Sequence, residues 1–210
     1  MNADAFQVLD TSDVGYVKTD VTGSSAILAT QAHVVRFNWS ATEAAVASTT
    51  GVHAAVTDNG SSQDISTSIT NPPCARNITA TAGGTAGDVK AIQVVVYGTD
   101  ASGAVITETL PAFTVNTTGT VTGSKAFATV TRIVIPAHDG TGATTAIGFG
   151  DKLGLPLKMS ANTIILTTLD GTPEGTAPTV AVSSSVLASN TIDLNSALNG
   201  TAVKAYALLP

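Results

Sequence analysis

Apolar and polar residues alternate in short runs along the chain, and the clearest case is VKAIQVVVYGTDASGAVITETL at residues 89–110. Two β-branched stretches, 94–96 and 105–107, flank the turn sequence Thr-Asp-Ala-Ser-Gly. β-Branched side chains fit a pleated, half-buried surface, Asp and Ser bond to nearby backbone, and Gly accepts a positive φ. The pattern therefore predicts a β-hairpin that contains no group suited to catalysis.

Similar runs, separated by turn signals, continue from Gly51 to the C-terminus. The pairs Asn59-Gly60 and Asn199-Gly200 are typical of tight turns. Many short strands at this spacing are typical of all-β proteins. We therefore expect an all-β fold, a β-sandwich or jelly-roll-like barrel of many short antiparallel strands.

Three segments allow more specific predictions. Residues 127–135 carry apolar side chains on both faces at period two, which predicts a central strand. The sequence DKLGLP at residues 151–156 is predicted to interrupt the strands, after which the alternation resumes. Residues 40–48 are the one candidate helix, with Ser40 as N-cap and Glu43 as its capping-box partner. Isolated helices this short are marginal, so a single turn or a strand is a close alternative.

The N-terminal segment differs from the rest of the chain. Residues 1–21 mix short apolar groups with scattered aspartates, which predicts an extended N-terminal arm or an edge strand. We divide the chain into the N-terminal arm with the first strands, residues 1–48, and a β-sandwich or barrel domain, residues 49–210. An alternative description of that domain separates a core, 49–159, from C-terminal strands of the same domain, 160–210.

Composition narrows the classes of function. The chain is 43% hydrophobic but 11% charged, against about 25% charged in typical domains, so hydroxyl groups replace ions on its surface. The net charge is −6 and Lys and Arg occur singly, so we expect no nucleic-acid partner. The start of the chain lacks the pattern of a secretory leader, which predicts folding in a reducing cytosol. No run is apolar over the roughly 20 residues of a membrane helix, so we expect no membrane partner.

The sequence offers few groups for chemistry, and we predict no catalytic, cofactor-binding or metal-binding residue. Cys74 is the only cysteine, which excludes a thiolate metal cage and an intrachain disulfide. His33 and His53 are interpreted as core-edge or interface residues. The pair His138-Asp139 is interpreted as part of a loop, with a hydrolase site as the alternative, because no G-x-S-x-G nucleophile motif accompanies it. Acidic residues beside glycine come one or two per loop, whereas calcium takes about 6–8 oxygens, so turns are favoured.

Five strings follow one another in the central part of the chain. They are GVHAAVTDNG at 51–60, ITNPPCARNITATAGGTAGDV at 69–89, GTDASGAVITETL at 98–110, SKAFATVTRIVIPA at 124–137 and GTGATTAIGFGDKLGLP at 140–156. In this order they resemble elements of virion structural proteins of tailed bacteriophages. Each string alone is common Gly/Thr/Val sequence, whereas five in order are far more specific. The resemblance implies a non-enzymatic, β-rich virion component of the capsid decoration (cement) type.

On this resemblance we expect a structural protein that binds and stabilises the assembled phage head. Its expected partners are the major capsid protein and further copies of itself in a homo-oligomer. Its expected location is the virion, after synthesis and assembly in the bacterial host cytoplasm. The alternative is a tail- or fibre-associated host-adhesion module that binds carbohydrate.

The residues expected to contact partners lie near the N-terminus. An extended arm can dock by adding a strand to a neighbouring sheet. Tryptophan is enriched at binding hot spots, although a core anchor is the other interpretation of Trp39 and its neighbour Phe37. The interface candidates are Phe6, Val8, Leu9, Tyr16, Phe37 and Trp39.

Overall fold

A computed structural model describes residues 33–209, so the predicted N-terminal arm lies outside the described residues. Within this part every strand pairing is antiparallel. Its helical segments are two short 3-10 turns, η2 (Ala86–Asp88) and η3 (Leu187–Ser189). The predicted all-β class with short antiparallel strands is confirmed for the described residues.

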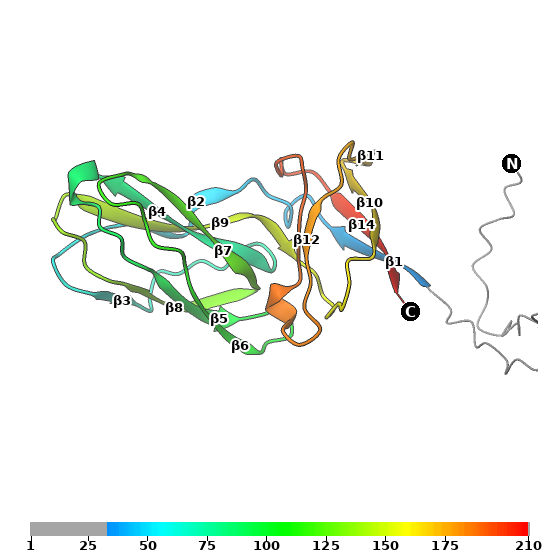
Figure 1. Ribbon diagram of the computed structural model, residues 1–210, viewed down its shortest axis with the longest axis horizontal. Helices are drawn as coiled ribbons and strands as arrows, with labels where there is room; N and C mark the ends of the chain where they lie inside the picture. The colour runs from blue at the N-terminus through cyan, green and yellow to red at the C-terminus, as the bar shows by residue number, and fades with distance from the viewer. Residues whose placement is uncertain (1–32, 210) are drawn as a thin grey trace, which may run out of the picture.

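Two sheets pack face to face as a β-sandwich, most of whose strands lie in the left part of Figure 1. The β9 sheet has the order β12-β13-β9-β4-β7, with β2 also paired to β9. Its strands are β2 (Ser48–Thr57), β4 (Arg76–Gly84), β7 (Gly119–Phe127), β9 (Ala143–Gly154), β12 (Thr179–Ala181) and β13 (Thr191–Asp193). The β8 sheet has the order β3-β8-β5-β6. Its strands are β3 (Gln63–Ile65), β5 (Val95–Thr99), β6 (Val105–Thr109) and β8 (Thr129–Ile135).

The β14 sheet lies beyond the sandwich, on the right of Figure 1, and has the order β1-β14-β10-β11. Its strands are β1 (His33–Trp39), β10 (Ile164–Leu169), β11 (Thr172–Pro173) and β14 (Val203–Leu209). β1 pairs with β14 along its whole length, so the first and last described segments are neighbours. This pairing joins the two predicted parts of the chain, 1–48 and 49–210, whose bounds stay a prediction.

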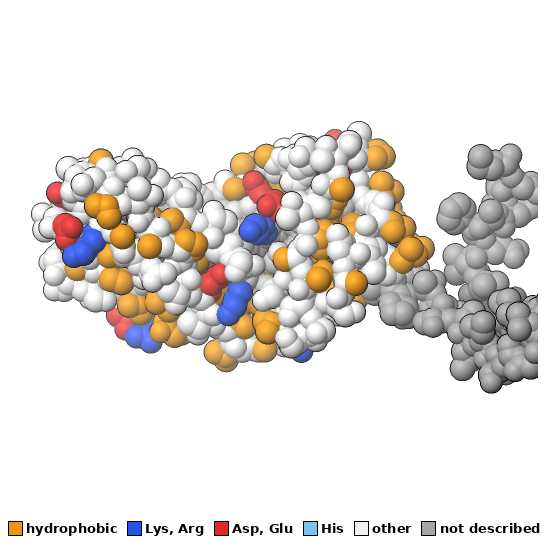
Figure 2. Space-filling model, in the orientation of Figure 1, with side chains coloured by type: hydrophobic (Ala, Val, Ile, Leu, Met, Phe, Trp, Pro, Cys, Tyr) orange, Lys and Arg blue, Asp and Glu red, His pale blue; other side chains and the backbone are white. Residues whose placement is uncertain are grey.

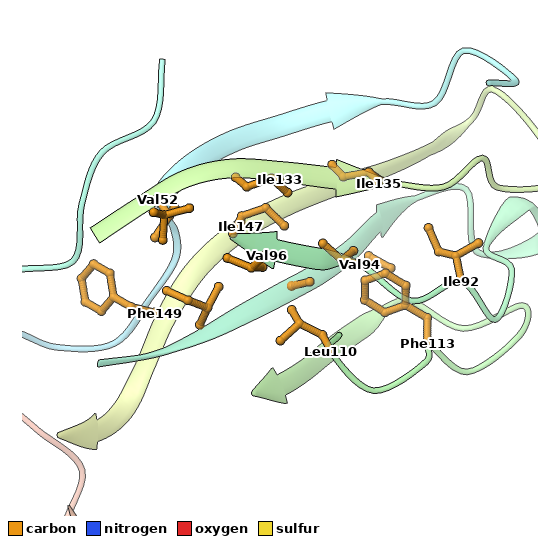
Figure 3. Close-up of a cluster of buried hydrophobic side chains, with 14 of the residues drawn as sticks. Val52, Ile92, Val94, Val96, Leu110, Phe113, Ile133, Ile135, Ile147 and Phe149 are labelled. Atoms are coloured by element: carbon orange, nitrogen blue, oxygen red, sulfur yellow. The ribbon is translucent and has the colours of Figure 1, made fainter. Parts of the chain in front are cut away.

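The interior of the sandwich is one apolar core. Side chains of a strand alternate between the two faces of its sheet, and in β4 the inward positions are Ile78, Ala80 and Ala82. Figure 3 shows Ile147 of the β9 sheet close to Val96 and Ile133 of the β8 sheet. The buried members are Val52, Ile78, Ala80, Ala82, Val89, Ile92, Val94, Val96, Leu110, Phe113, Phe127, Val130, Ile133, Ile135, Ala143, Ile147 and Phe149.

A second core lies between the β14 sheet and the end of β9. Its buried members are Phe37, Trp39, Ala44, Leu153, Leu155, Met159, Ile192, Leu194, Leu198, Val203, Ala205 and Ala207. β9 contributes to both cores, since Ile147 and Phe149 belong to the first and Leu153 to the second. One long strand therefore connects the two hydrophobic cores.

The predicted hairpin is confirmed, with β5 and β6 paired from Val95 opposite Thr109 to Thr99 opposite Val105. The Asp100 carboxylate closes the turn. Its Oδ1 atom accepts hydrogen bonds from the Ser102 amide at 2.9 Å, the Ser102 hydroxyl at 2.7 Å and the Ala104 amide at 3.1 Å. Gly103 has a φ of +82°, a conformation that L side chains rarely adopt. The turn chemistry is therefore local, which is why the sequence reveals it.

Two sequence predictions need correction. The candidate helix at 40–48 is a single turn, in which the Ser40 amide donates to Glu43 Oε2 at 2.8 Å and the Glu43 amide to Ser40 Oγ at 3.3 Å. The capping bonds form, but β2 begins at Ser48 and no helix follows. The predicted interruption at 151–156 is wrong for its first four residues, because β9 continues to Gly154. Leu153 is paired on one side with Arg76 and on the other with Ile192, which keeps the strand extended.

The predicted central strand is β8, which pairs with β3 on one side and β5 on the other. Its start differs from the prediction, since Phe127 belongs to β7 and Ala128 separates the two strands. Ile133 and Ile135 are buried as their spacing predicted. Alternation therefore indicated the central position of the strand, but it did not predict that Val130 lies in the same core as Ile133, which a register shift in the pairing with β5 allows.

A glutamate connects the edges of the two sheets. Glu108 of β6 is buried, and its Oε1 accepts hydrogen bonds from the Ser124 amide of β7 at 2.7 Å and from the Ser124 hydroxyl at 2.8 Å. Its Oε2 accepts the Lys125 amide at 3.2 Å. Lys125 Nζ donates in return to the Thr107 carbonyl at 2.8 Å. A side chain thus occupies amide groups of β7 that would otherwise be open to another strand.

Candidate functional site

A groove lies on the outer face of the β9 sheet, where β4, β7 and β9 run side by side. It is open to solvent and has a volume of about 320 Å³, within the size range of small-molecule sites. Its lining consists of Ala47, Ser48, Thr49, Asn77, Thr79, Thr120, Thr122, Phe149, Gly150, Asp151, Lys152 and Asp193. Most of the lining residues therefore carry a hydroxyl, amide or charged group.

The alternation of β4 explains the hydroxyl groups on the floor. Ile78 and Ala80 point into the sandwich core, so Thr79 points to the opposite face. Thr122 of β7 is the register partner of Thr79, and Thr120 lies two residues before it on the same face. The two strands thus place three threonine side chains on one surface of the sheet.

The Asn77 amide is held in one orientation at the edge of this floor. Its Oδ1 accepts the Lys152 amide at 3.0 Å, and its Nδ2 donates to the Gly123 carbonyl at 3.4 Å. Gly150 lies against it, since a Cβ atom there would come within 2.7 Å of Asn77 Nδ2. The glycine is therefore required for the close approach of the amide to β9.

Charged groups gather at one end of the groove. Asp151 Oδ1 lies 3.4 Å from Arg76 Nη2, and Lys152 and Asp193 also line the site. Burial raises the pKa of Asp193, while the charge of Lys152 opposes that rise. The two carboxylates are matched by the ammonium of Lys152 and the guanidinium of Arg76, so this end carries no net charge.

Arg76 lies beneath the groove with a side chain that is 0% exposed. Its Nη1 donates to the Ala45 carbonyl at 2.6 Å, and its Nη2 donates to the Gly150 carbonyl. The guanidinium carbon lies 4.7 Å from the centre of the Phe149 ring, a cation–π contact. Burial lowers the pKa of Arg76, but an arginine stays protonated at neutral pH. Sequence analysis missed this residue because only the tertiary fold surrounds it.

The structure places the two described interface candidates in the second core. Phe37 and Trp39 are each 6% exposed, and their ring centres lie 6.4 Å apart. They share the inward face of β1 with Val35, as the period-two spacing implies. The core interpretation therefore accounts for both rings. The other candidates, Phe6, Val8, Leu9 and Tyr16, lie outside the described residues.

An exposed apolar surface lies on the opposite face of the same sheet. Val34 of β1 and Leu208 of β14 are register partners and are 59% and 39% exposed. On β10, Leu166 pairs with Tyr206 on this face and is 42% exposed, and Ile165 beside it, at a bulge in the pairing, is 55% exposed. We call Val34, Ile165, Leu166 and Leu208 the apolar face. Figure 2 shows hydrophobic side chains at this end of the molecule. Elsewhere in the view most charged side chains lie beside a side chain of opposite charge, blue next to red.

Sequence analysis did not identify the apolar face, although one signal was present. In HVVRFNW the apolar residue Val34 precedes the inward series, so it falls on the outer face. A sequence alone does not show that Leu208 and Leu166 join it, because β1, β10 and β14 are distant in the chain. The apolar face is therefore a product of strand pairing.

His138 is a buried structural residue. Its Nδ1 accepts the Lys90 amide at 3.1 Å, which leaves Nε2 as the donor to the Thr145 hydroxyl at 3.0 Å. The backbone amide of His138 also donates to Asp58 Oδ1 at 3.0 Å. Both ring nitrogens therefore serve the fold. Burial lowers the pKa of His138, although the charges of Asp58 and Asp139 partly oppose the effect.

The lowered pKa of His138 predicts a loss of stability in mild acid. The unfolded histidine has a pKa of about 6.5, so below that pH the unfolded chain binds a proton that the folded chain does not. The urea midpoint should fall between about pH 7.5 and about pH 5.5. This decrease should be smaller in His138→Gln than in the wild type. An unchanged decrease in His138→Gln would contradict the assignment.

Cys74 is a half-buried thiol. Its Sγ lies 3.5 Å from the Glu43 carbonyl, and burial raises its pKa to about 11. A thiol with so high a pKa is almost entirely protonated at neutral pH and is a poor nucleophile. The interpretation of Cys74 as a packing residue thus agrees with its surroundings, since it packs against the second core.

Two further findings concern the described residues, and a third concerns the comparison of the chain with known proteins. No group of three or more His, Cys, Asp or Glu side chains within residues 33–209 is arranged to hold a metal ion. In the same range no helix has the length and apolar content to cross a membrane. The chain matches no protein-family model, and comparison with curated proteins and with solved structures also gives no match.

Proposed function

We propose that this protein is a non-enzymatic structural component of a tailed-phage virion, a decoration protein that binds and stabilises the assembled head. The five ordered strings that resemble phage virion proteins support this proposal. The main structural support is the apolar face, which we propose as the binding surface and which consists of Val34, Ile165, Leu166 and Leu208. Exposed apolar clusters of this kind mark interaction sites in soluble proteins.

The position of the apolar face suits attachment to a shell. It lies at the end of the molecule where β1 begins, away from the sandwich (Figure 1). The residues before β1, 1–32, include the predicted arm, so arm and apolar face would act on the same neighbouring surface. Attachment at one end leaves the sandwich projecting outward.

Stabilisation of the head follows from mass action. A site that spans two adjacent capsid subunits exists only in the assembled shell, so a ligand that binds there shifts the equilibrium away from disassembly. The β9 strand, shared by both cores, would hold the attached end and the projecting end together as one stiff unit. The major capsid protein is the proposed partner, and a homo-oligomer of the protein would add further contacts by avidity.

Binding to purified phage heads tests the proposal. In the double variant Val34→Lys/Leu208→Lys two charges replace exposed apolar side chains, so binding should weaken at least about tenfold. Deletion of residues 1–21 should also abolish binding and leave a folded β domain. The matched control is Val105→Lys, at a side chain that is 84% exposed on β6 in the sandwich, and it should bind normally.

Copy number in virions separates the head from the tail. A decoration protein should be present in numbers comparable to the major capsid protein, as measured by quantitative mass spectrometry. A handful of copies per particle would place the protein in the tail instead. Undiminished head binding by the double variant would refute the role of the apolar face.

A further inference from the structure

The groove on the β9 sheet presents unused hydrogen-bonding groups. The hydroxyls of Thr79, Thr122, Ser48 and Thr49 line it, and none of them forms a hydrogen bond to another residue within 33–209. By contrast, the neighbouring Thr120 hydroxyl bonds to Thr81 at 2.9 Å. Several donors and acceptors thus converge on one hollow and remain available to a ligand.

The fixed groups at the other side of the groove add directional contacts. The Asn77 amide is buried and held by two hydrogen bonds, so it keeps the floor of the groove in one arrangement. Asp193 supplies a carboxylate, and Asp151 is already engaged with Arg76. A carboxylate or an amide accepts hydrogen bonds from two adjacent hydroxyl groups, so this set suits a ligand with neighbouring hydroxyls.

Charge and polarity restrict the class of ligand. The charged end of the groove is balanced, so it offers no net positive charge to attract a sulfate or phosphate group. Apolar atoms make up much of the exposed lining, but hydroxyl, amide and charged groups are spread among them, which disfavours a purely hydrophobic molecule. Ala47 and the other apolar atoms of the lining can pack against the carbon face of a sugar ring. A neutral molecule with many hydroxyls and a modest apolar face meets all three conditions.

We infer that the groove is a binding site for a neutral saccharide. Thr79, Thr122 and Asp193 contact the sugar hydroxyls, Asn77 holds the floor of the groove, and Ala47 packs against the ring. The site is built from β2, β4, β7, β9 and β13, none of which belongs to the β14 sheet that carries the apolar face. Saccharide binding is therefore independent of the proposed attachment to phage heads, and either one can fail without the other.

Ligand-observed NMR with the full chain tests the inference. The probes are maltose, cellobiose, lactose and N,N′-diacetylchitobiose, with a sulfated heparin disaccharide as the anionic comparison. At least one neutral disaccharide should show saturation transfer, with a dissociation constant of about 1 mM or lower, while the sulfated disaccharide should not. Failure of all four neutral probes, or preference for the sulfated one, would overturn the inference.

Groove variants locate the binding. Thr122→Val keeps the shape of an exposed side chain but removes its hydroxyl, and Asp193→Asn removes a charge at the opposite end. Each should weaken saccharide binding roughly fivefold or more, since Thr122→Val removes a hydrogen bond and Asp193→Asn replaces an ionised acceptor with a weaker neutral one. The matched control Thr109→Val, on the exposed face of β6, should bind as the wild type does. If Thr122→Val and Asp193→Asn bound the saccharide as tightly as the control Thr109→Val, the saccharide would bind elsewhere and the proposed site would be refuted.

Discussion

Replacement of Arg76 by alanine should lower the free energy of unfolding by about 4 kcal/mol, the largest effect expected from any single substitution described. The side chain is fully buried, and its guanidinium donates to the carbonyls of Ala45 and Gly150. Alanine would leave both carbonyls without these donors, leave Asp151 without its cation and open a cavity beside Phe149. Each of these changes destabilises the folded state.

The location of Arg76 explains why the cost should be so large. Phe149 belongs to the first core, while Ala45 follows Ala44 of the second. The guanidinium therefore connects segments from both cores. Its Nε is buried and has no hydrogen-bond partner among the described residues, so part of the stabilisation is already offset in the native protein.

Urea unfolding of Arg76→Ala measures this effect. The matched control is Arg132→Ala, since Arg132 also forms an ion pair, at 2.6 Å with Asp64, and a cation–π contact with Tyr97. Both partners of that pair are exposed to solvent, so its loss should destabilise the protein far less than the loss of Arg76. If the two variants lost similar amounts of unfolding free energy, the burial of Arg76 would not explain its contribution to stability. A further variant, Arg76→Met, restores volume without charge and should recover part of the loss.

Asn190→Ala should lower the free energy of unfolding by about 3 kcal/mol. The side chain is 0% exposed, and both its oxygen and its nitrogen form hydrogen bonds to backbone groups. Its Oδ1 accepts the amides of Met159 at 3.0 Å and Ser183 at 2.9 Å. Its Nδ2 donates to the carbonyls of Ser183, Val186 and Leu187 at 2.9, 2.8 and 3.2 Å. Alanine would leave this set of buried polar groups without partners.

Thermal unfolding compares Asn190→Ala with two other variants. Asn162→Ala removes a single exposed bond, from the Ile164 amide at 3.1 Å, and should cost less than about 1 kcal/mol. Asn190→Asp keeps the two accepted bonds but loses every donated one and points a carboxylate at three carbonyls. It should therefore be about as damaging as alanine. If Asn190→Asp proved as stable as the wild type, the donated bonds would not matter.

Local structure could be predicted wherever its cause is local. The hairpin turn is closed by Asp100 within four residues, and Gly103 accepts the positive φ that the turn requires. The capping bonds between Ser40 and Glu43 also formed as their spacing implies, yet no helix followed. The segment after this turn is β2, whose pairing with β9 outweighs a short helical preference.

The end of strand β9 could not be predicted from neighbouring residues in the sequence. Asp, Lys and Gly at 151–154 are typical of a turn, which led to the predicted interruption. In the structure these residues stay extended because Leu153 has partners on both sides and is buried in the second core. Pairing partners come from residues 76 and 192, so their effect does not appear in any short window of sequence. The groove was missed for the same reason, since its lining comes from five strands.

By itself the sequence determined the all-β class, the hairpin, the central strand and the scarcity of charge. These properties depend on period-two alternation, turn residues and composition, which act over a few neighbours. Only the tertiary structure decided the pairing of β1 with β14, the burial of Phe37 and Trp39, the apolar face and the groove. The physical reason is that strand order depends on the sum of many distant contacts, and that sum decides which faces are covered and which remain open.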